Sequence, residues 1–198
     1  QRGRHQPQFL NSTVVTHHTP SSLLVTEELM RLLGYYTAEG RTEQYFTQFV
    51  FGLHEDDLHQ DCISLIKSVF NLAVATRAVP ETNSFRIYLS SPVVAEFFKR
   101  QCGTGSHQKH IPEILWALPK RYFLAYLKGY SEGDGYTTKD GKLSVCSVSK
   151  QLITELAWLS AMHGIQAGVR ETSAPAGRTI KSGGKPLPLS VSWNLVIG

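Results

Sequence analysis

The sequence predicts a mixed α/β fold made of two similar halves in one chain. Helical periodicity and strand-like runs alternate along the chain, and the same order of elements occurs twice. Two short glycine-containing segments, residues 32–40 (LLGYYTAEG) and 127–135 (LKGYSEGDG), nearly repeat each other. Their acids, Glu39 and Asp134, are 95 residues apart, a spacing that indicates a tandem repeat of one unit.

The composition is that of a folded globular protein with a modest excess of positive charge. The chain has 198 residues, 41% of them hydrophobic, a net charge of +4 and a pI near 9.0. This basic balance is compatible with a nucleic-acid partner. No apolar run approaches the roughly 20 residues that a bilayer requires, so we expect no membrane partner. Cys62, Cys102 and Cys146 form no Cys-x-x-Cys pair, which favours buried thiols in an intracellular, reducing compartment.

The first half predicts two helix–strand units after a polar arm. Thr26, followed by two acids, is a typical N-cap, and Leu29, Leu32, Leu33 and Tyr36 form one helical face up to Gly40. We expect Gly40 to end this helix in a left-handed conformation. Strand-like runs over 44–52, 74–79 and 84–89, and helices over 55–70 and from Ser91-Pro92 to about 102, follow.

The second half repeats much of this order. It predicts helices over 120–133 and 150–163, strands over 143–147, 165–171 and 189–197, and a loop over 172–188. The expected organisation is therefore an N-terminal arm (1–23), a first half (24–102), a connector (103–118) and a second half (119–198). Trp116, Trp158 and Trp193 are expected in the core.

The repeated segments have the chemistry of a paired metal site. Gly34 and Ala38 in one, and Gly129 and Gly133 in the other, put small residues on one helix face, where two backbones can approach closely. Such packing would bring Glu39 and Asp134 together, and divalent cations relieve the repulsion of paired carboxylates. Oxygen ligands without thiolates favour Mg²⁺, with Mn²⁺ as a substitute. The alternative is two exposed acids without a function.

These two segments resemble the paired motifs that define the LAGLIDADG homing endonucleases of the single-chain, pseudosymmetric type. The run Lys109-His110-Ile111-Pro112 resembles a third block, found between the two motifs in intein-encoded members. The resemblance spans residues 24–197. It implies two αββαββα-type halves whose antiparallel sheets form a saddle for DNA, acting as a monomer with internal pseudo-twofold symmetry.

The same resemblance implies a metal-dependent endonuclease that cuts both strands of a long double-stranded DNA target across the minor groove, leaving short 3′ overhangs. Glu39 and Asp134 would be the catalytic, metal-binding acids, with the carbonyl oxygens of Ala38 and Gly133 as further ligands. Lys109 would be the active-site lysine, which polarises the attacking water or steadies phosphate charge.

Three departures from the family are visible. The lysine of the second half has no certain match, because Lys181 and Lys185 lie in a loop. The hairpin after Gly40 is short, which limits the DNA platform of the first half. The chain has neither the first nor the last residue of an intact intein, so as given it is expected to be an excised endonuclease domain or a free-standing enzyme.

Strand alternation predicts which residues contact DNA. In 84–89 the residues Phe85, Ile87 and Leu89 face the core, as do Val191, Trp193 and Leu195 in 189–197. Arginine and glutamine suit base edges, while lysines in turns suit phosphates. The predicted DNA-binding set is Gln44, Gln48, Arg77, Ser84, Arg86, Tyr88, Lys139, Lys142, Arg170, Arg178, Lys181, Lys185, Ser190, Ser192 and Asn194.

A second function remains open from sequence. A protein could keep the saddle and lose cleavage, as a nucleic-acid-binding descendant such as an intron RNA-splicing maturase or a DNA-binding regulator would. The retained acid pair favours the nuclease, because a non-cleaving descendant has no need for both acids. A maturase can nonetheless keep its nuclease residues, so the sequence is compatible with both functions.

Overall fold

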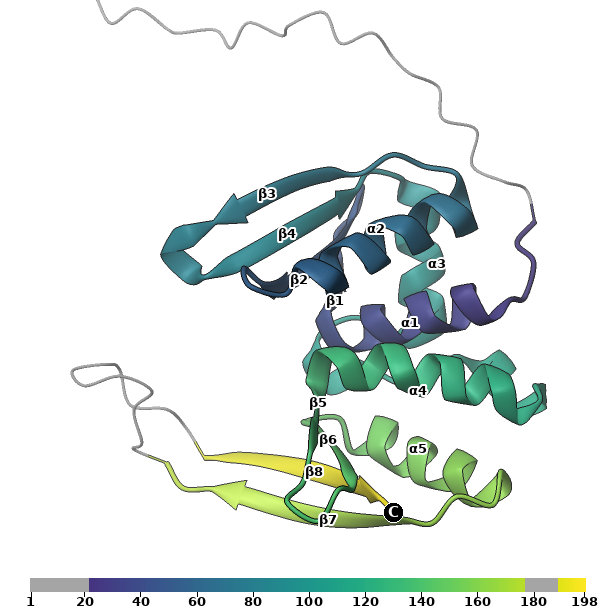
Figure 1. Cartoon of the computed structure of the whole chain (residues 1–198), viewed down its shortest axis with the longest axis vertical. Helices are drawn as coiled ribbons and strands as arrows, with labels where there is room; N and C mark the ends of the chain where they lie inside the picture. The colour runs from purple at the N-terminus through teal and green to yellow at the C-terminus, as the bar shows by residue number, and fades with distance from the viewer. Residues whose placement is uncertain (1–21, 177–188) are drawn as a thin grey trace, which may run out of the picture.

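The computed structural model describes residues 22–176 and 189–198 of the chain. Two similar halves meet through a central pair of helices, one from each half (Figure 1). The first half consists of α1 (Glu27–Glu39), β1 (Gly40–Thr42), β2 (Thr47–Gly52), α2 (Asp56–Phe70), β3 (Ala75–Val79), a 3₁₀ turn (Pro80–Thr82), β4 (Ser84–Leu89) and α3 (Pro92–Cys102).

Two short 3₁₀ turns, Ser106–Gln108 and Glu113–Ala117, lead into the second half. It consists of α4 (Lys120–Asp134), β5 (Gly135–Thr137), β6 (Leu143–Ser147), α5 (Lys150–Met162), β7 (Ala167–Ala174) and β8 (Ser190–Ile197). The order helix, hairpin, helix, hairpin therefore occurs twice, as the family resemblance implies.

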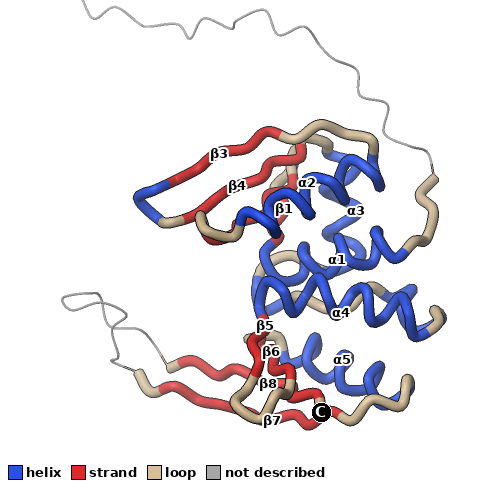
Figure 2. The backbone as a smooth tube through the Cα atoms, in the orientation of Figure 1, coloured by secondary structure: helices blue, strands red, loops and turns tan. Residues whose placement is uncertain are grey.

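Each half contributes one antiparallel four-stranded sheet. The strand orders are β1-β2-β4-β3 and β5-β6-β8-β7, so the two sheets have the same topology. Figure 2 shows the long hairpins of both sheets extending on the same side of the helices. In the first sheet Phe49, Phe51, Ile87 and Leu89 are buried on the face covered by helices, as alternation predicts for the β4 residues.

The central helices α1 and α4 pack backbone to backbone through glycines. A Cβ atom at Gly34 would lie 2.2 Å from the carbonyl oxygen of Tyr126, and one at Gly129 would lie 2.1 Å from that of Arg31. Any side chain at either position would therefore separate the helices. The predicted close approach at the two motifs is present, and α1 and α4 form the middle of one continuous core.

Several local predictions need correction. The backbone of Gly40 is extended (φ −93°) rather than left-handed, because α1 runs directly into β1, and Gly135 (φ −102°) repeats this at α4. The strands β1 and β5 are not in the prediction, and β2 begins at Thr47, so Gln44 lies in a turn. The strand β7 continues to Ala174, three residues into the predicted loop.

The tryptophans and cysteines divide between core and surface. Trp116 and Trp193 pack against the core, but Trp158 is 64% exposed on α5, contrary to the prediction. Cys62 and Cys102 are buried and Cys146 is half-buried. Among the described residues, none of the helices combines the length and apolarity needed to cross a membrane.

Candidate active site

Glu39 and Asp134 are the last residues of α1 and α4, the two helices that pack against each other. A Cβ atom at Gly133 would lie 2.6 Å from Cβ of Ala38, 2.9 Å from Cγ of Glu39 and 3.3 Å from its Oε1 atom. The end of α4 therefore touches the Glu39 side chain. The close helix packing that the glycines permit thus brings both acidic motifs to one edge of the molecule.

The electrostatic environment favours the protonated form of both acids. Partial burial, with repulsion from Asp134 and Glu55, raises the pKa of Glu39 to about 7. Desolvation by the surrounding protein raises the pKa of Asp134 to about 6, although the residue as a whole is exposed at the surface. Both acids also lie at the negative pole of a helix dipole. The site therefore has a surplus of negative charge when both carboxylates are ionised.

Among the described residues, Lys109 supplies a compensating cation for both acids. Its Nζ atom donates to the carbonyl oxygens of Tyr36 at 2.6 Å and of Gly40 at 2.8 Å, and lies 3.6 Å from the centroid of the Tyr36 ring. The side chain is 5% exposed, and burial lowers its pKa to about 8. Its charge lowers the pKa of both Glu39 and Asp134. Lys109 therefore lies close enough to influence the ionisation of both acids.

The donor set fits a hard divalent cation better than zinc. Within residues 22–176 and 189–198, no group of three or more His, Cys, Asp or Glu side chains gathers to hold a metal. Magnesium is commonly bound through one or two carboxylates, with water and substrate phosphates completing the coordination. Two carboxylates with raised pKa values, beside the main chain of Ala38 and Gly133, match that description.

The two halves of the site differ around the acids. Ser131 occupies the position in α4 that Tyr36 has in α1, and its hydroxyl donates to the carbonyl of Lys128 at 3.1 Å. The aromatic ring and the buried lysine therefore belong to the α1 side alone within the described residues. Lys181, a sequence candidate for the missing lysine, lies outside the described residues, as does Lys185.

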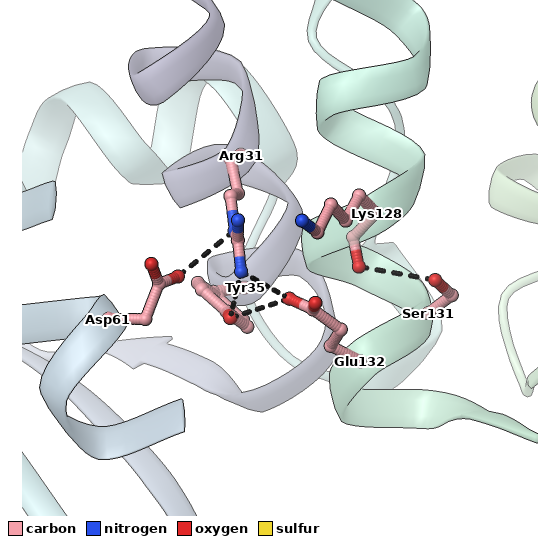
Figure 3. A network of polar contacts seen from close by, with 6 residues as sticks. All are labelled: Arg31, Tyr35, Asp61, Lys128, Ser131 and Glu132. Carbon is pink, nitrogen blue, oxygen red and sulfur yellow. Dashed lines mark hydrogen bonds and ion pairs between the residues drawn. The ribbon is translucent and has the colours of Figure 1, made fainter. Parts of the chain in front are cut away.

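A polar network joins the halves on the same two helices that carry the acids (Figure 3). Arg31 of α1 lies between Asp61 of α2 and Glu132 of α4, with its Nε atom 3.0 Å from Asp61 Oδ2 and its Nη2 atom 2.9 Å from Glu132 Oε2. Tyr35 donates to the same Glu132 oxygen at 2.6 Å. Glu132 directly precedes Gly133 and Asp134, so this network fixes the end of α4 against the first half.

The pseudo-twofold relation places a different pair at the corresponding point of the interface. Tyr126 corresponds to Arg31 and Thr37 to Glu132, each 95 residues away. The Tyr126 hydroxyl donates to Thr37 Oγ1 at 2.9 Å inside the core. One side of the helix pair is thus held by half-buried charges and the other by buried hydroxyls.

The face of the first sheet opposite the helices carries several predicted DNA contacts. Gln48 is only 1% exposed, and its buried amide is satisfied: the oxygen accepts from Arg41 Nε at 2.7 Å and the nitrogen donates to the Tyr88 hydroxyl at 3.4 Å. Ser84 is also buried, at 8% exposed, and its hydroxyl shares a hydrogen bond with Thr82. Arg41 is not in the predicted set because β1 is not predicted; the alternation of β1 with β2 places it beside Gln48.

Two arginines of this face oppose each other directly. Arg77 of β3 is the register partner of Arg86 of β4, and Arg77 is exposed. The Nε atom of Arg86 is buried and lacks a hydrogen-bond partner among the described residues. Directly opposed like charges destabilise a sheet. An anion bound over this pair would relieve the repulsion and satisfy the guanidinium group.

The corresponding face of the second sheet is rich in hydroxyl and amide groups. Asn194 donates to Thr172 Oγ1 at 2.9 Å, and Ser192 donates to the Thr172 carbonyl at 3.4 Å. Arg170 is the register partner of Asn194 and is exposed. The predicted residue Ser190 is half-buried on the same strand. Arginine side chains therefore dominate one sheet and small polar groups the other.

The predicted phosphate contacts lie partly in the turn between β5 and β6. Lys139 and Lys142 are exposed there, and Lys142 pairs with Asp140 at 3.2 Å. Gln44 is exposed in the turn between β1 and β2. Arg178 lies outside the described residues, together with Lys181 and Lys185.

Comparison with known proteins begins with sequence. No family model matches the chain. It is 25% identical over 169 residues to an uncharacterized protein of Methanocaldococcus jannaschii, which covers 77% of this chain and 18% of that protein. It is 28% identical over 145 residues to a DNA polymerase of Thermococcus kodakarensis, covering 72% of this chain and 9% of the polymerase. It is also 28% identical over 166 residues to an ATP-dependent DNA helicase of the same organism, a match that covers 80% of this chain and 15% of the helicase. The chain thus spans less than a fifth of the length of these relatives.

Comparison of structures establishes the fold. A mesophilic variant of the homing endonuclease I-DmoI superimposes with a TM-score of 0.61 at 14% identity, covering 88% of this chain and 89% of that one. I-DmoI in complex with DNA and Mn gives 0.59 at 15% identity, covering 88% and 91%. The N-terminal LAGLIDADG domain of DUF199/WhiA gives 0.56 at 13% identity, covering 89% and 78%. The chain therefore has the two-half LAGLIDADG fold, as its paired motifs predict.

Proposed function

We propose that this protein is a site-specific endonuclease that hydrolyses both strands of a long double-stranded DNA target with Mg²⁺, for which Mn²⁺ can substitute. The observation that carries the proposal is the convergence of Glu39 and Asp134. Each acid ends one of two packed helices, the end of α4 touches the Glu39 side chain, and both carboxyl groups have raised pKa values. A divalent cation shared by the two carboxylates would relieve their mutual repulsion.

In this proposal the acids and the adjoining main chain hold the metal. Glu39 and Asp134 supply the carboxylates, and the carbonyl groups of Ala38 and Gly133 supply further oxygen atoms. A bound divalent cation supplies activation of a water molecule and charge stabilisation at the leaving oxygen of a phosphodiester. Lys109 neutralises the end of α1 and adds positive charge beside the acids, where phosphate charge would build up.

The partner in this proposal is duplex DNA lying across the helix-free faces of the two sheets. Arg41, Arg77 and Arg86 on the first sheet, and Arg170 and Asn194 on the second, supply groups suited to phosphates and base edges. One chain contains both halves, so a monomer suffices for the two half-sites.

Two similarities support the proposal. The fold is that of I-DmoI, whose structures include complexes with DNA and Mn. The chain also resembles short parts of much longer proteins, including a DNA polymerase. We therefore infer that this chain is an endonuclease domain of the kind carried inside a host protein or intron. The intein-encoded endonuclease domains are the type that we propose it resembles.

The acid pair provides the main test. Targets would first be selected from a pool of random DNA duplexes by sequencing the ends that the protein produces with Mg²⁺. Glu39→Gln and Asp134→Asn are then expected to abolish cleavage and leave DNA affinity within a few-fold. Glu113→Gln, at an exposed acid in the connector, is the control and should cleave normally. Unchanged cutting by either site variant would remove that acid from the mechanism.

Lys109 is tested separately because it also has a structural contact. Lys109→Met retains the length of the side chain and removes the charge that faces the Tyr36 and Gly40 carbonyls. We expect a large loss of single-turnover rate with little loss of DNA affinity. A defect confined to affinity would reassign Lys109 to phosphate positioning.

A non-cleaving nucleic-acid-binding protein is the second candidate function. It is favoured by the likeness to WhiA, whose N-terminal domain has the same fold. It predicts tight binding to a selected DNA or structured RNA and no nicks in the presence of Mn²⁺. A single nick in the selected DNA that depends on Glu39 would exclude it.

A further inference from the structure

The segment that carries Lys109 is fastened to both halves of the molecule. The Lys109 side chain reaches the end of α1, in the first half. Its main-chain carbonyl accepts from Ser149 Oγ at 2.6 Å, and the amide of Ile111 donates to Glu155 Oε2 at 3.0 Å. Ser149 and Glu155 belong to the start and the middle of α5, in the second half. The main chain of one residue and the side chain of the same residue are thus held by opposite halves.

Ser149 uses its hydroxyl twice. As the N-cap of α5, it accepts from the amide of Leu152 at 3.2 Å, and it donates its own proton to the Lys109 carbonyl. It is 1% exposed, so water does not replace either contact. Ser91, the N-cap of α3, is also buried and accepts from the amide of Val94 at 3.3 Å. The contact to Lys109 therefore distinguishes two otherwise equivalent capping serines.

We propose that Ser149 and Glu155 are positioning residues for Lys109, which hold residues 109–111 on α5 so that the lysine reaches the acid pair. A lysine side chain has many rotamers, and ordering it in a buried position costs conformational entropy. Anchoring the main chain at residues 109 and 111 removes much of the remaining freedom. The second half thereby completes the α1 side of the site, and the site is assembled only when the halves are docked. The effect on cleavage rests on the proposed function, but the placement of Lys109 does not.

The test measures the accessibility of Lys109 directly, in the full chain without DNA or metal. The protein is treated briefly with acetic anhydride, and the acetylation of each lysine is measured by peptide mass spectrometry. The wild-type Lys109 should be strongly protected. Ser149→Ala and Glu155→Ala should each increase its acetylation by about fivefold or more, which is the population shift expected from loss of one hydrogen bond.

The controls separate positioning from capping and folding. Ser91→Ala removes an equivalent cap and should leave Lys109 protected. Ser149→Thr and Glu155→Gln retain the donor and the acceptor, so they should restore protection. Circular dichroism establishes that each variant is folded. If both Ser149→Ala and Glu155→Ala leave Lys109 as protected as in the wild type, the proposal is overturned.

A second measurement distinguishes failure of this proposal from failure of the proposed function. On a selected DNA target, Ser149→Ala should lower the single-turnover cleavage rate and leave the DNA dissociation constant unchanged, while Ser149→Thr recovers the rate. Exposure of Lys109 without any cleavage by the wild type would retain the positioning role and reject the nuclease. If the wild type cleaves DNA and neither variant changes the cleavage rate or the acetylation of Lys109, the nuclease function is retained and the positioning role is rejected.

Discussion

At the scale of single residues, Glu39 and Asp134 occupy places where an ionised acid is unfavourable. Each ends a helix, at the pole where carbonyl oxygens already carry partial negative charge. The buried ammonium group of Lys109 caps two of these carbonyls on the α1 side, yet both acids retain raised pKa values. The same unfavourable placement of an acid thus occurs in both halves, which supports the proposal that the two acids share a cation.

This cost predicts a pH dependence of folding in the absence of metal. The pKa values of about 7 for Glu39 and about 6 for Asp134 lie above their values of 4.5 and 3.8 without these neighbours. The folded state therefore binds more protons than the unfolded chain between about pH 4 and pH 7, and stability falls as the pH rises through that window. With EDTA present, Glu39→Gln should be more stable than the wild type at pH 8 by about 1 kcal/mol after allowance for solvent screening. Urea denaturation at several pH values measures this difference.

The same experiment carries its own control. At pH 4 the Glu39 carboxyl group is protonated in the folded state and mostly protonated in the unfolded state, so Glu39→Gln and wild type should have nearly equal stability. Adding Mg²⁺ at pH 8 should stabilise the wild type and leave Glu39→Gln nearly unchanged, because a ligand stabilises the state that binds it. A stability difference that is the same at pH 4 and pH 8 would argue against the raised pKa.

At the scale of elements, the α1–α4 contact depends on two glycines. A Cβ atom at Gly34 or Gly129 would overlap main-chain carbonyl oxygens at 2.2 and 2.1 Å, and a backbone cannot yield as a side chain can. Gly34→Ala and Gly129→Ala should each destabilise the protein by about 1–3 kcal/mol, the usual cost of overpacking. Gly168→Ala is the control, because nothing lies within 4 Å of its added Cβ atom. Thermal unfolding of the three variants measures the difference. Equal changes in melting temperature for Gly168→Ala and for the two helix variants would show that the helix contact is unimportant.

The Arg31 network predicts strong coupling between elements. Removing the cation in Arg31→Met leaves the carboxylates of Glu132 and Asp61 without their partner, which should cost about 1–2 kcal/mol at this half-buried site. Glu132→Gln should cost less, because its amide oxygen still accepts from Tyr35. The double variant should be more stable than the sum of the single effects implies. Additive changes in a double-mutant cycle would show that the two side chains act independently.

The elements themselves were predictable where the chain is strongly periodic or capped. The Thr26 and Ser91 caps, the helix from Lys150 and the alternation in β4 follow from local chemistry. The strands β1 and β5 do not, because three residues are too few to show a period of two. They form because β2 and β6 offer edge hydrogen bonds to the residues that directly follow α1 and α4. This also explains the extended conformation of Gly40.

At the scale of the whole molecule, two sheets present different surfaces on their helix-free faces. The opposed arginines Arg77 and Arg86 cost stability in the free protein and would gain from a bound phosphate. Arg77→Gln should therefore raise the urea midpoint slightly and weaken DNA binding. The slope of log affinity against log salt should decrease by about 0.9 for each phosphate that the variant no longer neutralises. Arg100→Gln on α3, where Arg100 pairs with Glu96, should leave DNA binding unchanged. Equal binding by Arg77→Gln and wild type would remove β3 from the interface.

For the candidate site, the meeting of Glu39 and Asp134 could be predicted from the sequence, but the contacts around them could not. The matched spacing of Glu39 and Asp134 in two glycine motifs indicates that they meet, and Lys109 follows from the resemblance of the connector. The contacts to Ser149 and Glu155, which lie 40 and 44 residues from their partners in the chain, leave no local signal. The network of Arg31, Asp61 and Glu132 is likewise invisible until the halves are docked, because its members come from three helices.

The unequal pairs across the helix interface, Arg31 with Glu132 and Tyr126 with Thr37, have a consequence for how this fold can change. In a dimer of identical subunits every substitution occurs twice, once on each side of the axis. In this single chain, a substitution in one half leaves the other half unchanged. Under the proposed function, one half could be altered to accept a new stretch of DNA while the other retains its own, by single steps that a homodimer could take only in duplicate.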